Sequence, residues 1–290
     1  MKNKFKYILL AMMAVVCFSC SEDEPSSESI IVVDEKVKNE FDNWLTKNYV
    51  YPYNIDFKYR MEDIESDLNY TLVPAEFDKS VKLAKLVKYL CLEAYDEVAG
   101  VDFMRSYFPK MIHLVGSPAY RSNGTMVLGT AEGGLKITLY NVNNVNTSNI
   151  DDLNYFYFKT IHHEFSHILN QTKNYPTDFA DISGADYISD SWNSLTDAQA
   201  LAKGFISPYA SSEASEDFVE LIAIYITHDA TYWSTMLTSA GTVGAPIINQ
   251  KFEIVYNYML NSWGIDLNEL RSVVQRRSGE IGNLDLDNLN

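Results

Sequence analysis

Two histidines and a glutamate near the middle of the chain have the types and the spacing of a catalytic zinc site. His163 and His167 lie four residues apart in the run HEFSH. On an α-helix this separation projects the two imidazoles about 40° apart, so both can bind one Zn²⁺ at about 2.0–2.1 Å. Glu164 lies beside them, where a carboxylate can take a proton from water that the metal activates. The run therefore predicts a zinc-dependent hydrolase with one Zn²⁺ per chain.

The third metal ligand is expected downstream, because a catalytic zinc normally has three protein ligands and one open position. Residues 168–178 contain no further histidine. The best source is the run EASEDFVE at 213–220, where Glu216 and Glu220 share one face of a predicted helix and the opposite face is apolar. Such a helix could pack across the histidine helix and present a carboxylate to the metal. The alternative for either carboxylate is a solvated helix face.

Hydrophobic periodicity predicts the elements that must hold these residues. Helical spacing of apolar side chains predicts helices over residues 33–48, 79–95, 97–108, 151–170, 213–228, 247–262 and 267–277. Short apolar runs bounded by turn residues predict strands over residues 111–115, 125–128 and 135–140. Residues 171–208 are predicted to be a long connection, which is often functional in a compact domain. We expect an α+β, zincin-like fold, in which a small mixed sheet precedes a mainly helical half and zinc lies in the cleft between them.

The N-terminus is predicted to be an export signal that ends at a lipid anchor. Residues 1–19 begin with lysines and continue with an apolar run that is too short to span a bilayer. The Ser19-Cys20 pair at its end resembles a bacterial lipoprotein signal, which would leave Cys20 as the lipidated first residue. Residues 20–32 are polar and acidic, and they predict a solvated tether. An acidic stretch directly after the lipidated cysteine also resembles the surface-export signal of Bacteroidetes-type lipoproteins.

The remaining chain, residues 33–290, is predicted to form a single catalytic domain. Its three parts are a helical part over 33–110, the sheet and histidine helix over 111–170, and a second helical part over 171–290. Cys91 is the only cysteine of this domain, so no intramolecular disulfide is expected.

The composition limits the classes of partner. The chain has 39 Asp and Glu against 23 Lys and Arg, and its formal net charge is −16. Such a charge repels phosphate backbones and anionic lipid headgroups, so we expect no nucleic-acid partner and no membrane contact beyond the lipid anchor. Hydrophobic residues make up 47% of the chain, which is enough for a packed core and argues against disorder.

The two histidines and a later glutamate resemble the metal ligands of gluzincins. In the lethal-factor-like subgroup of gluzincins, a tyrosine lies seven residues before the ligand glutamate and a second glutamate follows four residues after it. Tyr209, Glu216 and Glu220 have this spacing. The resemblance implies that Glu216 is the third zinc ligand, that Tyr209 donates a hydrogen bond to the oxyanion formed during hydrolysis, and that Glu220 supports the ligands.

Over most of its length the chain is also similar to the Bacteroidetes substrate-import-associated zinc metallohydrolase lipoproteins, a metallopeptidase family. The shared landmarks are VGS at 115–117, GTA at 129–131, HEFSH at 163–167, GF at 204–205, and YA at 209–210 leading to EDFVE at 216–220. This resemblance implies a zinc metallopeptidase with a peptide or protein substrate, located as an outer-membrane lipoprotein at the cell surface. It also implies a link to TonB-dependent nutrient import. Two alternatives stay open: a zinc hydrolase of a non-peptide bond, and a catalytically inactive binding lipoprotein at the cell surface.

Overall fold

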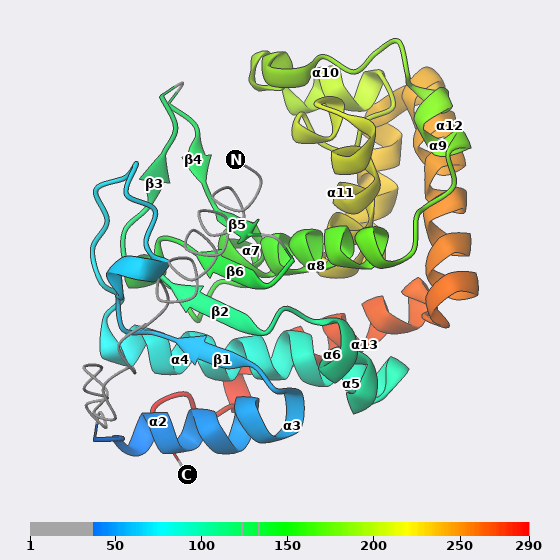
Figure 1. Ribbon diagram of the computed structural model, residues 1–290. Helices are drawn as coiled ribbons and strands as arrows, with labels where there is room; N and C mark the ends of the chain where they lie inside the picture. Colours follow the sequence, from blue (N-terminus) through cyan, green and yellow to red (C-terminus); the bar gives the residue numbers. More distant parts are fainter. Residues whose placement is uncertain (1–36, 123, 133, 290) are drawn as a thin grey trace, which may run out of the picture. The chain divides into compact units, whose positions relative to one another are not determined.

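A small mixed sheet and a larger set of helices make up the chain in a computed structural model, which describes residues 37–289 except 123 and 133 (Figure 1). The described residues from 39 onwards form one compact unit. The fold is α+β, as the sequence predicts. The predicted signal over 1–19, the lipidated Cys20 and the tether over 20–32 lie outside the described residues.

The first helical part begins at a capping box. The side chain of Asn39 accepts a hydrogen bond from the Asp42 backbone, and the Asp42 carboxylate accepts one from the Asn39 backbone. This reciprocal cap starts the helix at residue 40, so the predicted helix over 33–48 is wrong at residues 37–39, and residues 33–36 lie outside the described part of the chain. The elements here are α2 (Glu40–Leu45), the π-helical η1 (Thr46–Val50), α3 (Tyr51–Tyr53), α4 (Phe77–Val87), the π-helical η3 (Lys88–Leu92), α5 (Glu93–Ala99) and α6 (Val101–Tyr107).

The sheet has the strand order β1-β2-β6-β5. The strands β1 (Asp56–Lys58), β2 (Met111–Leu114) and β6 (Lys136–Leu139) run parallel, whereas β5 (Gly129–Glu132) pairs antiparallel with β6 at the edge. Two of these strands, β1 and β5, are absent from the sequence prediction. Three or four residues with few apolar side chains give no detectable alternation, and such strands are defined by backbone pairing.

The predicted strand over 125–128 belongs to a different structure. It is β4 (Met126–Val127), which pairs with β3 (Ala119–Tyr120) in a separate two-stranded hairpin. The predicted strands over 111–115 and 135–140 are confirmed as β2 and β6. Short 3₁₀ turns complete this region at η2 (Asp63–Glu65) and η4 (Val142–Asn144).

The histidine-bearing helix packs directly against the edge of the sheet. It consists of α7 (Ile150–Leu153), the π-helical η5 (Asn154–Phe158) and α8 (Lys159–Thr172), and Asn149 caps its start by accepting from two backbone amides. A Cβ atom at Gly129 of β5 would lie 2.4 Å from Cγ2 of Thr160. Only glycine therefore allows α8 to approach β5 this closely.

The second helical part holds more structure than the sequence predicts. The predicted connection over 171–208 contains α9 (Asp178–Ile182), the 3₁₀-helical η6 (Ser189–Ser194) and α10 (Asp197–Ala202). The helices that follow are η7 (Tyr209–Ser211), α11 (Ala214–Thr227), α12 (Ala230–Trp263), α13 (Leu267–Gly279) and η8 (Ile281–Asn283). The prediction of 247–262 covers only the second half of α12, which is kinked at Gly241, where φ is 70°. A glycine in a sequence predicts the end of a helix. Here Gly241 takes a positive φ at a bend, and α12 is helical on both sides of it.

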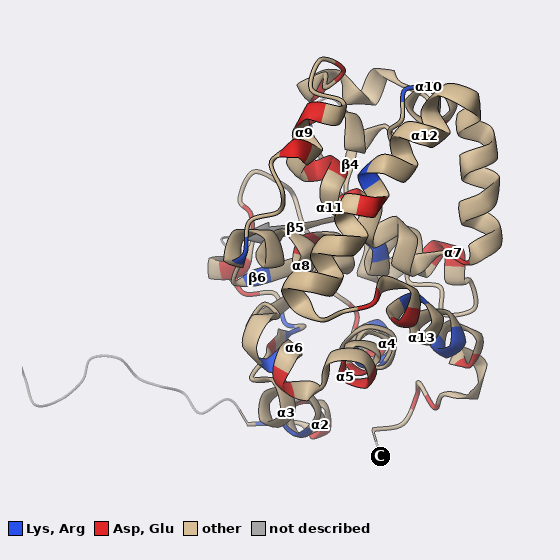
Figure 2. Ribbon diagram, turned by 90° about the vertical axis from the view of Figure 1, so that its right-hand side faces the viewer, with Lys and Arg blue, Asp and Glu red and all other residues tan. Residues whose placement is uncertain are grey.

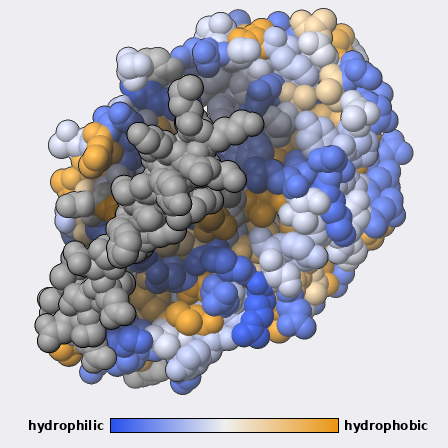
Figure 3. All heavy atoms as spheres, in the orientation of Figure 1, coloured by the Kyte–Doolittle hydropathy of each residue, from blue (hydrophilic) through white to orange (hydrophobic). Residues whose placement is uncertain are grey.

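The surface agrees with an acidic, water-exposed domain. Acidic side chains are distributed over several helices, including α7 and α9 (Figure 2). On the face drawn in Figure 3, hydrophilic residues cover much of the right-hand side and hydrophobic residues occur in small groups. No helix in the described part of the chain is both long enough and apolar enough to cross a membrane.

A fully buried ion pair fixes α11 against the rest of this half. Lys251 of α12 contacts Asp217 of α11 at 2.6 Å, and both side chains have 0% exposure. The Lys251 ammonium also donates to the Gly204 carbonyl at 2.9 Å, and the Tyr187 hydroxyl donates to Asp217 at 3.0 Å. Burial raises the pKa of Asp217 and lowers the pKa of Lys251, because each charged form has lost its hydration. The pair thus joins α11, α12 and the segment before η7.

We expect Lys251→Met to destabilise the protein by about 3–5 kcal/mol, because it leaves the Asp217 carboxylate buried without its countercharge. Urea unfolding of the metal-free protein measures this free energy. The double variant Asp217→Asn with Lys251→Met removes both charges and keeps an acceptor for Tyr187, so it should cost less than the single change. A double variant that is less stable than Lys251→Met would contradict this account of the pair.

Candidate active site

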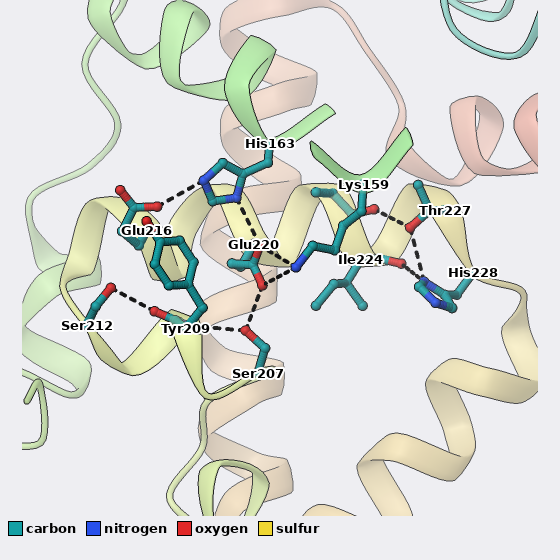
Figure 4. Close-up of polar contacts among 12 residues, drawn as sticks. Lys159, His163, Ser207, Tyr209, Ser212, Glu216, Glu220, Ile224, Thr227 and His228 are labelled. Atoms are coloured by element: carbon teal, nitrogen blue, oxygen red, sulfur yellow. Dashed lines mark hydrogen bonds and ion pairs between the residues drawn. The ribbon is translucent and has the colours of Figure 1, made fainter. Parts of the chain in front are cut away.

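The residues predicted to form a zinc site meet where α11 packs along α8. Figure 4 shows His163 between the carboxylates of Glu216 and Glu220. His163 and His167 come from α8, and Glu216 comes from the first turn of α11. Oε2 of Glu216 lies 2.9 Å from Nε2 of His163 and 3.3 Å from Nε2 of His167. The two Nε2 atoms are 3.2 Å apart.

This donor set fits a zinc ion. One ligand atom from each of His163, His167 and Glu216 lies within 4.8 Å of the others. Two imidazole nitrogens and one carboxylate oxygen are the ligands of a common type of catalytic zinc site. The same three residues line a cavity of about 220 Å³, which leaves room for a further ligand. The site can therefore hold the metal and still admit water or substrate.

Glu220 lies behind His163 rather than in the donor set. Its side chain is 1% exposed, and its Oε1 lies 2.9 Å from Nδ1 of His163. Because an ionised carboxylate can only accept hydrogen bonds, Nδ1 of His163 carries a proton and donates a hydrogen bond to Glu220. Nε2 is then left to face Glu216 and His167. Glu216 therefore lies where a third zinc ligand must lie, and Glu220 lies where it can support His163. Both roles remain predictions.

The charged side chains of the site shift one another's pKa values. Burial raises the pKa of Glu216, but hydrogen bonds from His163 and His167 outweigh burial and lower it to about 2. Burial lowers the pKa of His163, but hydrogen bonds to Glu216 and Glu220 outweigh that effect and raise it to about 9. Burial likewise raises the pKa of Glu220, whereas the charge of Lys159 and the contact with His163 hold it well below its usual value. Both carboxylates are therefore ionised at neutral pH.

Glu164 and Tyr209 lie on the wall of the same cavity. The other lining residues, apart from the three donors, are Gly134, Ile168 and Gln171. The ring centroid of Tyr209 is 5.8 Å from that of His163, and the rings of Trp192 and Tyr209 pack in a T-shaped arrangement with their centroids 5.1 Å apart. Burial and the nearby charge of Glu216 raise the pKa of the Tyr209 phenol well above its usual value, so the phenol keeps its proton. A protonated phenol can donate a hydrogen bond into the cavity.

The neighbouring His162 is directed away from this cavity. Its side chain is fully buried, and Nδ1 lies 3.3 Å from the hydroxyl of Tyr95. Burial lowers its pKa to about 3, so the imidazole is neutral. His162 therefore belongs to the core under α8.

Three further residues of the site are missing from the sequence prediction: Lys159, Ser207 and Trp192. Lys159 and Ser207 both contact the carboxylate of Glu220, and Trp192 supports Tyr209. Lys159 carries a detectable signal, because it lies one helical turn before His163 and so shares its face. Ser207 lies in an irregular segment and Trp192 in the short 3₁₀ helix η6, and neither carries such a signal.

A protein family described as "Putative zinc-binding metallo-peptidase" matches residues 34–268. The chain belongs to this family. A crystal structure of a protein with the same description, from Bacteroides caccae ATCC 43185, is similar to the described fold with a TM-score of 0.78 and 53% sequence identity. That similarity covers 90% of this chain and 100% of the other. No protein of curated function matches the chain. Membership in a zinc-binding metallo-peptidase family agrees with the donor set of His163, His167 and Glu216.

Zinc binding should release a proton from His163. In the metal-free protein the pKa of His163 is about 9, so the imidazole is protonated at neutral pH. The metal can take Nε2 only after that proton leaves, so zinc affinity should rise by up to about tenfold per pH unit below this pKa and level off above it. Titration calorimetry at neutral pH in two buffers of different ionisation enthalpy measures the release, which should be about one proton per zinc. Identical binding enthalpies in the two buffers would show that His163 is already neutral.

Proposed function

We propose that the protein is a zinc metallopeptidase that hydrolyses peptide bonds with one zinc per chain. The observation that carries the proposal is the convergence of His163, His167 and Glu216 on one point, with Glu164 and Tyr209 on the wall of the same cavity. Membership in a zinc-binding metallo-peptidase family supports it. The gluzincin-like arrangement, with two histidines on one helix and a glutamate on a later one, supports the same class.

Each side chain of the cavity has a distinct chemical part in this proposal. Zinc, when bound, supplies Lewis acidity that polarises a carbonyl and lowers the pKa of water towards about 7. Glu164 accepts the proton of the attacking water and returns it to the leaving nitrogen, so it is a general base and then a general acid. Tyr209 donates a hydrogen bond to the oxyanion that forms when water adds to the carbonyl. Glu220 orients His163 through Nδ1.

The edge of the sheet offers a place for an extended peptide. In the described sheet β5 is an outer strand, paired with β6 on one side, and it lies against the helix that carries the histidines. Gly134, in the turn that follows β5, lines the cavity. A peptide that adds to β5 as a further strand gains backbone hydrogen bonds that do not depend on its side chains. We propose that substrate lies along β5, in a zincin-like cleft between the sheet and the helical half.

Two variants separate metal binding from turnover. Glu164→Gln should keep stoichiometric zinc by elemental analysis and should slow cleavage of a peptide library by about 10²–10⁴-fold, since an amide cannot take a proton. Tyr209→Phe should also keep zinc and should slow cleavage by about 10²–10³-fold, because one oxyanion donor is lost. Glu216→Ala is the contrasting variant, because it removes a donor and should lose zinc.

The outcomes distinguish the competing functions. A wild-type protein that binds zinc and leaves the peptide library intact would favour a hydrolase of a non-peptide bond or an inactive binding protein. Zinc retained in full by Glu216→Ala would remove Glu216 from the donor set. Turnover by Glu164→Gln at the wild-type rate would exclude Glu164 as the base.

We also propose that the protein is an outer-membrane lipoprotein at the cell surface, linked to TonB-dependent import of nutrients. The support is the lipoprotein-like signal that ends at Cys20, the acidic tether over 20–32 and the similarity to a protein from Bacteroides caccae. A hydrolase on such a tether could cut peptides near an import system, and its acidic surface would give it little affinity for anionic headgroups.

Cys20→Ser should move the protein from the membrane fraction to the soluble fraction of the producing bacterium, because it removes the thiol that carries lipid. Cell fractionation and intact mass of the mature protein measure this shift. Wild-type protein without a lipid mass increment, or a variant that stays in membranes with lipid attached, would overturn the anchor at Cys20.

A further inference from the structure

The carboxylate of Glu220 is buried under the proposed zinc site and depends on three partners. It is 1% exposed, and removing a carboxylate from water is costly unless charge and hydrogen bonds compensate it. His163 donates to Oε1, and Ser207 donates to Oε2 at 2.6 Å. The third partner is Lys159, whose Nζ lies 3.0 Å from Oε1 and 3.1 Å from Oε2.

Lys159 has a defined position relative to the metal-binding histidine. It is the first residue of α8, one helical turn before His163. Its ammonium and the imidazole Nδ1 of His163 contact the same oxygen of Glu220, so the three groups form a continuous chain (Figure 4). Among the described residues, Lys159 is the only lysine or arginine that forms an ion pair with Glu220. Its side chain is 23% exposed, which is low for a lysine.

The same carboxylate also reaches the turn that carries Tyr209. Ser207 donates to Glu220 and accepts a hydrogen bond from the backbone N–H of Ala210 at 3.1 Å. Ala210 lies in η7 directly after Tyr209. Glu220 therefore contacts the proposed zinc ligand His163 on one side. On the other side it is linked through Ser207 to the turn that carries Tyr209, the proposed oxyanion donor.

We propose that Lys159 is a positioning residue of the zinc site, which acts through Glu220. Its charge compensates the buried carboxylate and holds it where it accepts from Nδ1 of His163, and this contact keeps Nε2 directed at Glu216. The Lys159 ammonium pairs with Glu220, and Lys159 is not among the residues that line the cavity, so the effect of its charge on zinc passes through Glu220. The inference rests on the proposed zinc site but not on the cleavage of peptides.

The test compares zinc affinities in a double-variant cycle. Competition with a chelating dye measures the zinc dissociation constant of the full chain. Lys159→Met and Lys159→Gln should each weaken zinc binding by about 10–100-fold, as loss of an outer partner of a ligand does. Lys159→Arg keeps the charge and should restore affinity to within about threefold of wild type. In a Glu220→Gln background, where no carboxylate remains to be compensated, Lys159→Met should change affinity by less than about threefold.

The controls separate this effect from loss of folding. Lys88→Met removes a lysine of similar exposure, 24%, that pairs with Glu93 outside the site, and it should leave zinc affinity unchanged. Thermal unfolding of each metal-free variant shows which variants are folded, and if Lys159→Met is not, Lys159→Gln decides. A wild-type protein that fails to bind zinc would refute the proposed function itself. Wild-type affinity in the Lys159 variants, or an undiminished loss in the Glu220→Gln background, would overturn the role of Lys159 while leaving the zinc site in place.

Discussion

The packing of α11 along α8 is the contact on which the candidate site depends. Each helix alone carries only part of the donor set: two histidines on α8 and one glutamate on α11. Glu220 strengthens that contact because it is an acceptor from α11 for both Lys159 and His163 of α8. A polar link of this kind, buried and fully compensated, restricts the two helices to one relative position more strictly than apolar packing does.

Two other features fix those helices from opposite sides. On one side, Gly129 lets α8 lie close against β5, so the histidines are held at a set distance from the edge strand. On the other side, the Asp217–Lys251 pair ties α11 to α12 immediately after the donor Glu216. The donors are therefore carried by regular elements that are supported by the core, which is how a preorganised site is built.

The residues that the structure brings together at the candidate site could be predicted from the sequence because they lie at short, regular spacings along the chain. His163 and His167 are four residues apart, which places them on one face of a helix. The seven-residue separation of Tyr209 and Glu216 matches the spacing of the lethal-factor-like gluzincins, and this resemblance singles out Tyr209 and Glu216. The strand β5 could not be predicted in the same way, because the run GTAE has no apolar alternation and pairs through its backbone. Likewise the partnership of Lys159 and Glu220 joins positions 61 residues apart, and only the packing of α8 on α11 creates it.

Because the three candidate ligands are divided between two helices, the complete metal site can form only after the two helices have packed together. His167 and Glu216 are 49 residues apart, and the chain between them contains α9, η6, α10 and η7. A nascent or unfolded chain offers two neighbouring imidazoles without the carboxylate, a bidentate ligand with weak hold on a metal. Zinc held by these three residues would therefore stabilise only the folded domain, and the fraction of chains with zinc would report how many have folded. Under the proposed function, the chain would be unable to hydrolyse its substrate until Glu216 docks beside the two histidines.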